Sequence, residues 1–143
     1  MKKIVLIFLS LTMFTMASTS REEYLEKKDY YKSSIQNAPS EYEMEEVASE
    51  YNNFLNKDID ATYKYLLLKL NDRKELKNAF IGTQEEWKKL RDKEYQMIEL
   101  SFKDSRGSIS GFAILVNENQ ILIDRLDYLT SLIPEEGDIT SVF

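Results

Sequence analysis

The stretch QEEWKKLRDKEY, residues 84–95, decides the fold of this chain. Placed on a helix, it brings Trp87, Leu90 and Tyr95 close to one face. Thr83 lies about one turn earlier on that face. The stretch also holds the single tryptophan of the 143-residue sequence. It therefore predicts an amphipathic helix with one bulky apolar anchor.

Apolar residues continue at helical intervals on both sides of this stretch. The stretch falls inside a helix predicted over residues 73–102, and further helices are predicted over residues 41–70 and 108–132. In each helix, apolar residues recur every three or four positions, which is the period of one helix face. The fragment GFAILV, residues 111–116, also has the composition of a strand, but the helical spacing continues to Ile133 and favours a helix.

Polar turns mark the ends of these helices. Ser40 is predicted to cap the first helix, with Glu43 completing a capping box. Asn71 and Asp72 form the turn to the second helix, and Gly107 lies where a glycine commonly ends one. Two long helices joined by so short a turn are expected to be antiparallel neighbours, with the third helix in their groove. The sequence therefore predicts an all-α domain, an antiparallel helical hairpin plus a third helix that together make a three-helix bundle.

Residues 1–20 have the pattern of a secretory signal peptide. Lys2 and Lys3 precede an uncharged, mostly apolar run from Ile4 to Ala17, and small residues follow it. The run is shorter than the about 20 apolar residues of a membrane span, although an uncleaved anchor is the alternative. We therefore expect export across the inner membrane, to a periplasmic or extracellular location.

The rest of the chain divides into three predicted parts. Residues 21–39 are dense in charge and are expected to form a charged segment or a short helix. The helical domain is predicted over residues 40–134. Residues 135–143 are expected to be a C-terminal tail.

Composition argues against several kinds of site. The sequence has no cysteine and no histidine, which removes disulfides, thiolate metal sites and the commonest general base. It also lacks a Gly-rich phosphate loop and a Ser-centred nucleophile elbow. A thin helical body offers no obvious cleft for a catalytic carboxylate pair. We therefore expect no metal, no cofactor and no catalytic residue, in a protein that is not an enzyme.

The charge balance indicates the kind of partner. The formal net charge is −6, and losing Lys2 and Lys3 with residues 1–20 changes it to −6 − 2 = −8. Such a chain is not expected to bind nucleic acid, or a membrane after signal cleavage, because both attract basic surfaces. A basic protein is the partner that this charge suits.

The stretch at residues 84–95 resembles the central signature of the LprI-type lysozyme-inhibitor family. The resemblance rests on the spacing Gln-x-x-Trp-x-x-apolar-Arg-Asp, met here by Gln84, Trp87, Arg91 and Asp92. Flanking parts of the pattern also match over about residues 41–132, at these positions: Met44, Tyr63, Gly107, Ser108, Arg125 and Leu129. Where the family pattern has cysteines, this chain has Val47, Tyr95 and a residue near Asn117.

The resemblance implies an exported, non-enzymatic helical protein that binds a lysozyme-type muramidase and blocks its cleft. The candidate partner is thus a basic lysozyme. Because loops on a rigid scaffold usually carry binding, the candidate binding loops are the Asn71–Asp72 turn and the loop at Asp104, Ser105 and Arg106. The rival interpretation is a structural or scaffolding envelope protein that uses the same module without inhibiting lysozyme.

The motif residues are expected to be mainly structural, although Trp87 is also a candidate interface anchor and Arg91–Asp92 a candidate recognition pair. Gln84 is expected to form a hydrogen bond across the helix pair. Arg125 should need an acidic partner, and the candidates are Asp60, Asp92 and Glu94. The ring of Tyr63 is expected to be buried, with its hydroxyl at the rim.

Overall fold

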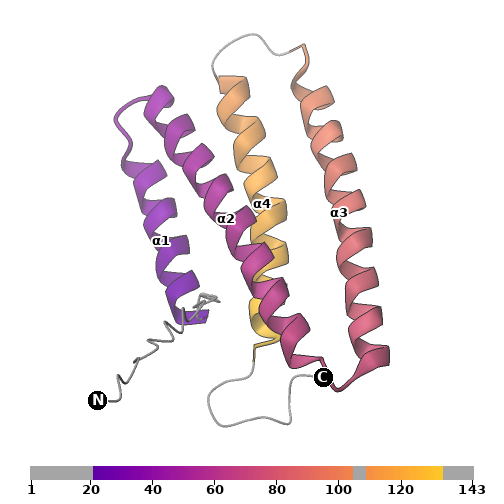
Figure 1. The fold of residues 1–143 in the computed structure, drawn as a ribbon. Coiled ribbons are helices and arrows are strands. Elements are labelled where there is room, and N and C mark those ends of the chain that lie inside the picture. Colours follow the sequence, from indigo (N-terminus) through magenta and orange to yellow (C-terminus); the bar gives the residue numbers. More distant parts are fainter. Residues whose placement is uncertain (1–20, 105–108, 134–143) are drawn as a thin grey trace, which may run out of the picture.

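The computed structural model describes residues 21–104 and 109–133, which form four α-helices and no strand (Figure 1). The prediction of an all-α protein is confirmed. The predicted signal peptide, the tail and the loop residues Ser105 and Arg106 lie outside the described residues. None of the described helices is both long and apolar enough to cross a membrane. The helices are α1 (Arg21–Asn37), α2 (Glu41–Lys69), α3 (Lys74–Phe102) and α4 (Ile109–Ser131).

The start of α2 has the predicted cap. The Ser40 Oγ accepts a hydrogen bond from the Glu43 backbone N–H at 3.3 Å and donates one to the Glu43 carboxylate at 2.7 Å. Ser40 itself has extended backbone angles, as an N-cap residue should. At the other end, the chain turns through Asn71 and Asp72, and α3 begins at Lys74.

The spatial order of the helices is α1, α2, α4, α3 (Figure 1). Closely spaced backbone is most extensive between α2 and α4, which run in the same direction, while α3 lies along α4 and α1 lies along α2. The expectation that α2 and α3 are the closest neighbours is therefore wrong. The reason is burial, since α4 has the richer apolar face and takes the place beside α2.

The core is built mainly from α2 and α4. Leu55 and Leu66 of α2, and Leu122, Leu126 and Leu129 of α4, are completely buried. The fragment at residues 111–116, which also had strand composition, lies within α4 and is helical. α3 contributes much less, because its only buried side chains are Phe80, Gln84 and Ile98.

A buried amide fixes how α4 lies along α2. Asn119 is 4% exposed, and its Nδ2 donates to the Ala48 carbonyl at 2.8 Å while its Oδ1 accepts from Asn52 Nδ2 at 2.8 Å. One turn from the start of α4, a Cβ on Gly111 would lie 2.9 Å from the Glu45 carboxylate. A shift of α4 along α2 would leave the Asn119 amide without its buried partners, which is costly.

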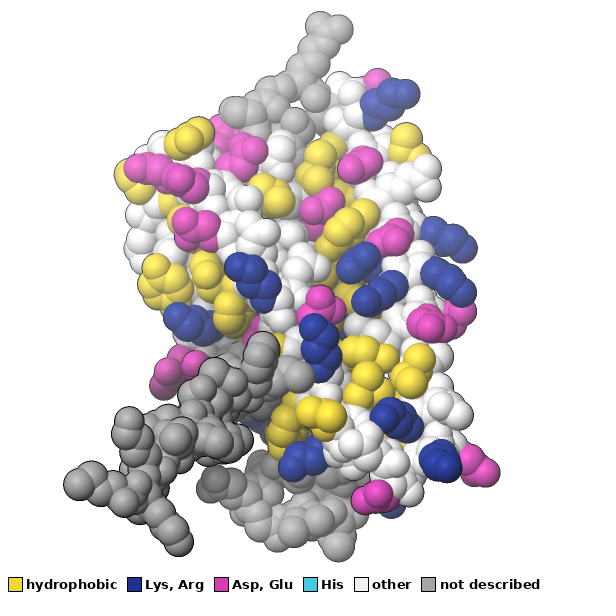
Figure 2. All heavy atoms as spheres, in the orientation of Figure 1, with side chains coloured by type: hydrophobic (Ala, Val, Ile, Leu, Met, Phe, Trp, Pro, Cys, Tyr) yellow, Lys and Arg dark blue, Asp and Glu magenta, His cyan; other side chains and the backbone are white. Residues whose placement is uncertain are grey.

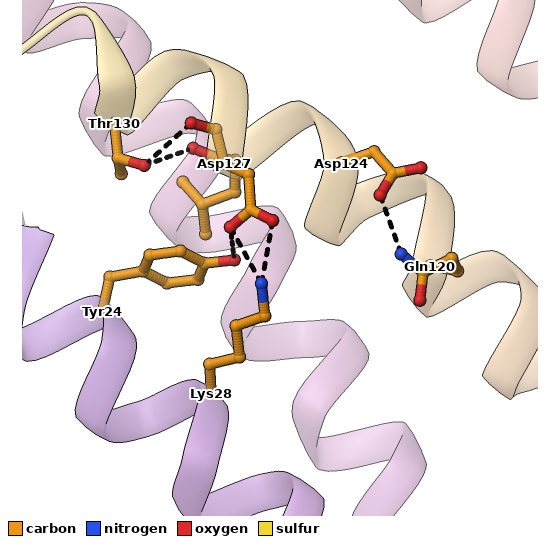
Figure 3. A network of polar contacts seen from close by, with 7 residues as sticks. Tyr24, Lys28, Gln120, Asp124, Asp127 and Thr130 are labelled. Carbon is orange, nitrogen blue, oxygen red and sulfur yellow. Dashed lines mark hydrogen bonds and ion pairs between the residues drawn. The ribbon is translucent and has the colours of Figure 1, made fainter.

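The segment left open as a charged segment or short helix is a helix, α1, joined to α4 by a polar network (Figure 3). Tyr24 is 1% exposed, and its hydroxyl donates to Asp127 Oδ1 at 2.6 Å. Lys28 forms an ion pair with Asp127 Oδ2 at 2.8 Å. Tyr31 of α1 also stacks on Tyr51 of α2, with ring centroids 4.6 Å apart. The first helix is thus fixed to the last, and the described bundle has four helices rather than three.

Replacing Tyr24 with phenylalanine is expected to lower the free energy of unfolding by about 2 kcal/mol, because a buried hydrogen bond to a charged acceptor is lost. Urea denaturation followed by circular dichroism measures the change. The matched control is Tyr30→Phe, since Tyr30 is 60% exposed, and it should change stability by less than about 0.5 kcal/mol. Equal effects of the two substitutions would contradict the structural role of the network.

Alkaline pH is expected to unfold the protein through its buried tyrosines. Burial raises the pKa of Tyr24 and Tyr51, and it raises the pKa of Tyr95 to about 12. In the unfolded chain these hydroxyls ionise near pH 10. Their stabilising contribution is therefore complete below about pH 10 and is lost as the pH rises towards the folded values. Tyrosinate absorbance and circular dichroism should change together in this range; complete ionisation with unchanged helicity would refute the expectation.

Candidate functional site

The motif residues come from three helices and meet where α3 faces α4. Gln84, Trp87 and Arg91 are spaced at i, i+3 and i+7 along α3, which places them on one helix face. Arg125 reaches this face from α4. Tyr63 of α2 is close enough that its hydroxyl and the Arg125 guanidinium affect each other's pKa.

Trp87 is contacted by two guanidinium groups. The Arg91 Cζ lies 5.3 Å from the Trp87 ring centroid, and the Arg125 Cζ lies 5.2 Å from it. Arg91 also lies 5.8 Å from the Tyr95 ring, and Arg125 lies 5.2 Å from the Tyr128 ring. We call Tyr95, Arg91, Trp87, Arg125 and Tyr128 the Trp–Arg row. Each cation over an aromatic face contributes about 0.5–2 kcal/mol, and the contact of Arg125 with Trp87 is the one of these four that joins α4 to α3.

The two arginines of the row have different polar partners. Arg91 forms an ion pair with the neighbouring Asp92, with Nη2 and Oδ1 2.7 Å apart. Arg125 donates from Nε, at 3.0 Å, and from Nη2 to the Gln84 Oε1. Gln84 thus takes part in a hydrogen bond between helices, although the partner is on α4 and not across the α2–α3 hairpin that was expected.

The prediction of an acidic partner for Arg125 is wrong for the described residues. Asp60 is exposed on α2, Asp92 pairs with Arg91, and Glu94 is not within ion-pair distance of Arg125. The physical reason is that a flat guanidinium can be satisfied by a carbonyl oxygen in its plane and by aromatic rings on its faces. Burial lowers the pKa of Arg125, while the nearby Tyr128 and Tyr63 hydroxyls oppose that shift.

Tyr63 lies between the row and the core. Its ring centroid is 5.3 Å from that of Phe80, across the α2–α3 pair. The side chain is half-buried, and burial raises the pKa of its hydroxyl, with the Arg125 charge opposing the rise. The contact with Phe80 agrees with the expectation of a packed ring.

A hollow of about 270 Å³ lies beside the row, between α3 and α4. Trp87 and Arg125 line it together with Leu90, which is 54% exposed, and Tyr128, which is 47% exposed. The helical spacing predicts Leu90 on an apolar face, whereas it assigns no role to Tyr128. The signal for Tyr128 was its position three residues after Arg125, on the same face of the helix.

The two candidate binding loops lie at opposite ends of the bundle. Asn71 and Asp72 are exposed at the α2–α3 turn, where the Asn71 side-chain oxygen accepts a hydrogen bond from Lys77 Nζ at 2.6 Å. Asp104 is exposed just beyond the other end of α3. The 29 residues of α3 span about 43 Å at 1.5 Å per residue. One compact partner site therefore cannot depend on both loops equally.

The two ends also differ in charge. Residues 41–50 at the start of α2 include five glutamates, Glu41, Glu43, Glu45, Glu46 and Glu50, and no lysine or arginine. Figure 2 shows acidic side chains gathered at the upper left, over the end where α2 begins. We call residues 41–50 the acidic end. They border a hollow of about 390 Å³ whose lining includes Tyr42, which is 76% exposed.

The opposite end of the bundle has more basic than acidic residues around its turn. Lys69, Arg73, Lys74 and Lys77 lie around the α2–α3 turn, and the acidic residues between them are Asp72 and Glu75. Nowhere in the described ranges do three or more potential metal ligands converge.

The fold and the row define a small all-helical protein in which side chains of α3 and α4 interlock beside an α2–α4 core. The family model described as Lysozyme inhibitor LprI matches residues 32–129. The chain belongs to this family, and the resemblance in the sequence is confirmed. The match contains the whole Trp–Arg row, whereas Tyr24 and Lys28 of α1 lie before it. Neither a curated protein nor a solved structure matches the chain.

Replacing Gln84 with leucine is expected to lower the free energy of unfolding by about 2 kcal/mol, because the half-buried Arg125 loses its hydrogen-bond acceptor. Urea denaturation measures the loss. Gln96→Leu is the matched control, since Gln96 is exposed on the same helix, and it should change stability by less than about 0.5 kcal/mol. A Gln84→Leu protein as stable as the parent would show that the Gln84–Arg125 contact is not needed.

Proposed function

We propose that this protein is an exported, non-enzymatic lysozyme inhibitor that binds a basic lysozyme-type muramidase and blocks its substrate cleft. The observation that carries the proposal is membership of the LprI family over residues 32–129. The signal-peptide pattern of residues 1–20 supports delivery to the periplasm or the exterior, where a lysozyme would be met.

The functional module in this proposal is the helical domain at residues 40–134, in which α2, α3 and α4 form the three-helix unit. α1 is an added brace, attached through Tyr24 and Lys28. The motif residues act within the module. Their contacts join α3 to α4, and so they position the binding surface rather than form it.

Charge favours one of the two candidate loops. A basic lysozyme would be steered towards the acidic end, which lies at the same end of the bundle as Asp104, two residues beyond α3. The Asn71–Asp72 turn lies among lysines and arginines, which would repel a basic partner. We therefore place the contact at the acidic end, with Tyr42 as an exposed aromatic anchor.

Matched charge reversals test this placement. The double variant Glu46→Lys, Glu50→Lys alters exposed residues of the acidic end, and Asp72→Lys, Glu75→Lys alters exposed residues at the opposite end. Both variants change the net charge by the same amount. The first should weaken binding to a basic lysozyme at least about tenfold, and the second should have a much smaller effect. Calorimetric titration and lytic activity provide the measurements.

The outcomes separate the possibilities. Equal losses in the two variants would show that overall charge, not the acidic end, governs binding. A larger loss in the second would assign the contact to the Asn71–Asp72 turn. If the parent protein neither binds nor inhibits lysozyme at micromolar concentration, inhibition is refuted and the structural or scaffolding role in the envelope takes its place.

A further inference from the structure

Arg125 has an unbalanced charge. It is half-buried, and within the described part of the chain no carboxylate lies within ion-pair distance of its guanidinium. The guanidinium donates hydrogen bonds to a neutral amide oxygen, and it contacts the rings of Trp87 and Tyr128. Arg91 contacts the same indole but has Asp92 as counter-ion. Removing a guanidinium from water without a counter-ion is costly, so Arg125 is suited to receive an external anion.

A second polar group at this place also lacks a partner. Gln84 is 2% exposed, and its Nε2 has no hydrogen-bond acceptor among the residues that the structure describes. The amide cannot be turned around to cure this, because a guanidinium only donates and must face the Gln84 oxygen. The bonded pair Gln84–Arg125 therefore has N–H groups that can still donate hydrogen bonds. It carries one positive charge and no negative charge.

The hollow beside Arg125 combines an apolar surface with acidic groups. Trp87, Leu90, Ile121 and Tyr128 supply the apolar part. Glu94 and Asp124 also line the hollow, and Asp124 accepts a hydrogen bond from Gln120 Nε2 at 2.7 Å (Figure 3). The hollow is thus lined by one guanidinium group, two carboxylates and several apolar side chains.

We propose that this hollow binds a small zwitterion with an apolar side chain, namely a free α-amino acid. Its carboxylate pairs with Arg125, its ammonium group lies against Glu94 and Asp124, and its side chain covers Leu90 and Ile121. A simple anion would be repelled by the two carboxylates, and a simple cation by Arg125. The volume of about 270 Å³ is slightly below the usual range for ligand pockets, which restricts the ligand to this size.

Trp87 provides a direct probe, since it is the single tryptophan of the sequence and lines the hollow. The full chain is titrated with L-leucine, with leucinamide, which has no carboxylate, and with N-acetyl-leucine, which has no ammonium group. Leucine should give a saturable change in Trp87 fluorescence and in the NMR shift of its indole N–H. Each analogue should bind at least about tenfold more weakly, because one charged contact is lost.

Variants assign the contacts. Asp124→Asn and Glu94→Gln change residues outside the core and should weaken leucine binding while leaving N-acetyl-leucine binding unchanged or improved. Arg125→Lys should weaken leucine binding about tenfold, because a bidentate guanidinium contact is lost. Arg91→Lys is the matched control on the same indole and should have little effect. Thermal melts verify that each variant is folded.

Three results would overturn the proposal. The first is no saturable response to millimolar leucine in either the fluorescence or the indole N–H shift. The second is leucinamide binding as tightly as leucine, which removes the role of Arg125. The third is an equal loss of leucine binding in Arg91→Lys and Arg125→Lys. Lysozyme is absent from the assay, so these results do not depend on the proposed inhibitory function.

Discussion

Burial of the apolar face of α4 is the constraint on which the rest of the structure depends. Leu122, Leu126 and Leu129 are completely buried, and together they provide several kcal/mol of hydrophobic stabilisation, at about 1.5–3 kcal/mol per side chain. Such a face needs cover along its length, and α2 supplies it in parallel orientation (Figure 1). α1 and α3 are then left to the outer positions, one beside each helix of the central pair.

The outer position of α3 explains why its attachment is made by unusual side chains. With only Phe80, Gln84 and Ile98 buried, α3 has little apolar surface with which to hold α4. The Arg125 guanidinium of α4, which lies over the Trp87 ring and donates to the Gln84 oxygen, attaches it instead. Guanidinium is the cation suited to this place, because it is weakly hydrated and pairs with flat aromatic faces. α1 is held in a comparable way, by a tyrosine hydroxyl and a lysine converging on one carboxylate of α4.

The sequence predicted what local periodicity and capping determine. The predicted ranges of α2, α3 and α4 agree with the structure to within a few residues, and the Ser40 cap is present. The neighbours predicted from the sequence were wrong, because periodicity marks the apolar face of a helix and not the helix that covers this face. Tyr24 and Asp127 are 103 residues apart, and Tyr24 lies in a charged segment whose helical pattern is weak. The missing acid at Arg125 was unforeseen because Trp87 and Gln84 of α3, together with Tyr128 of α4, take its place.

The positions in the family signature follow from the geometry of the row. Gln84, Trp87 and Arg91 lie on one face of α3, and Arg125 with Tyr128 meets them from one face of α4. The signature therefore specifies how α3 docks on α4. Arg125 contacts Trp87 and Gln84, so what remains of it faces a small hollow that can admit a small ligand but not a protein surface. Under the proposed function, target choice then depends on residues outside the signature, and the glutamates at the start of α2 are where this chain concentrates its negative charge. α2 would in that case serve both purposes, with its apolar face in the core and its first turns towards the partner.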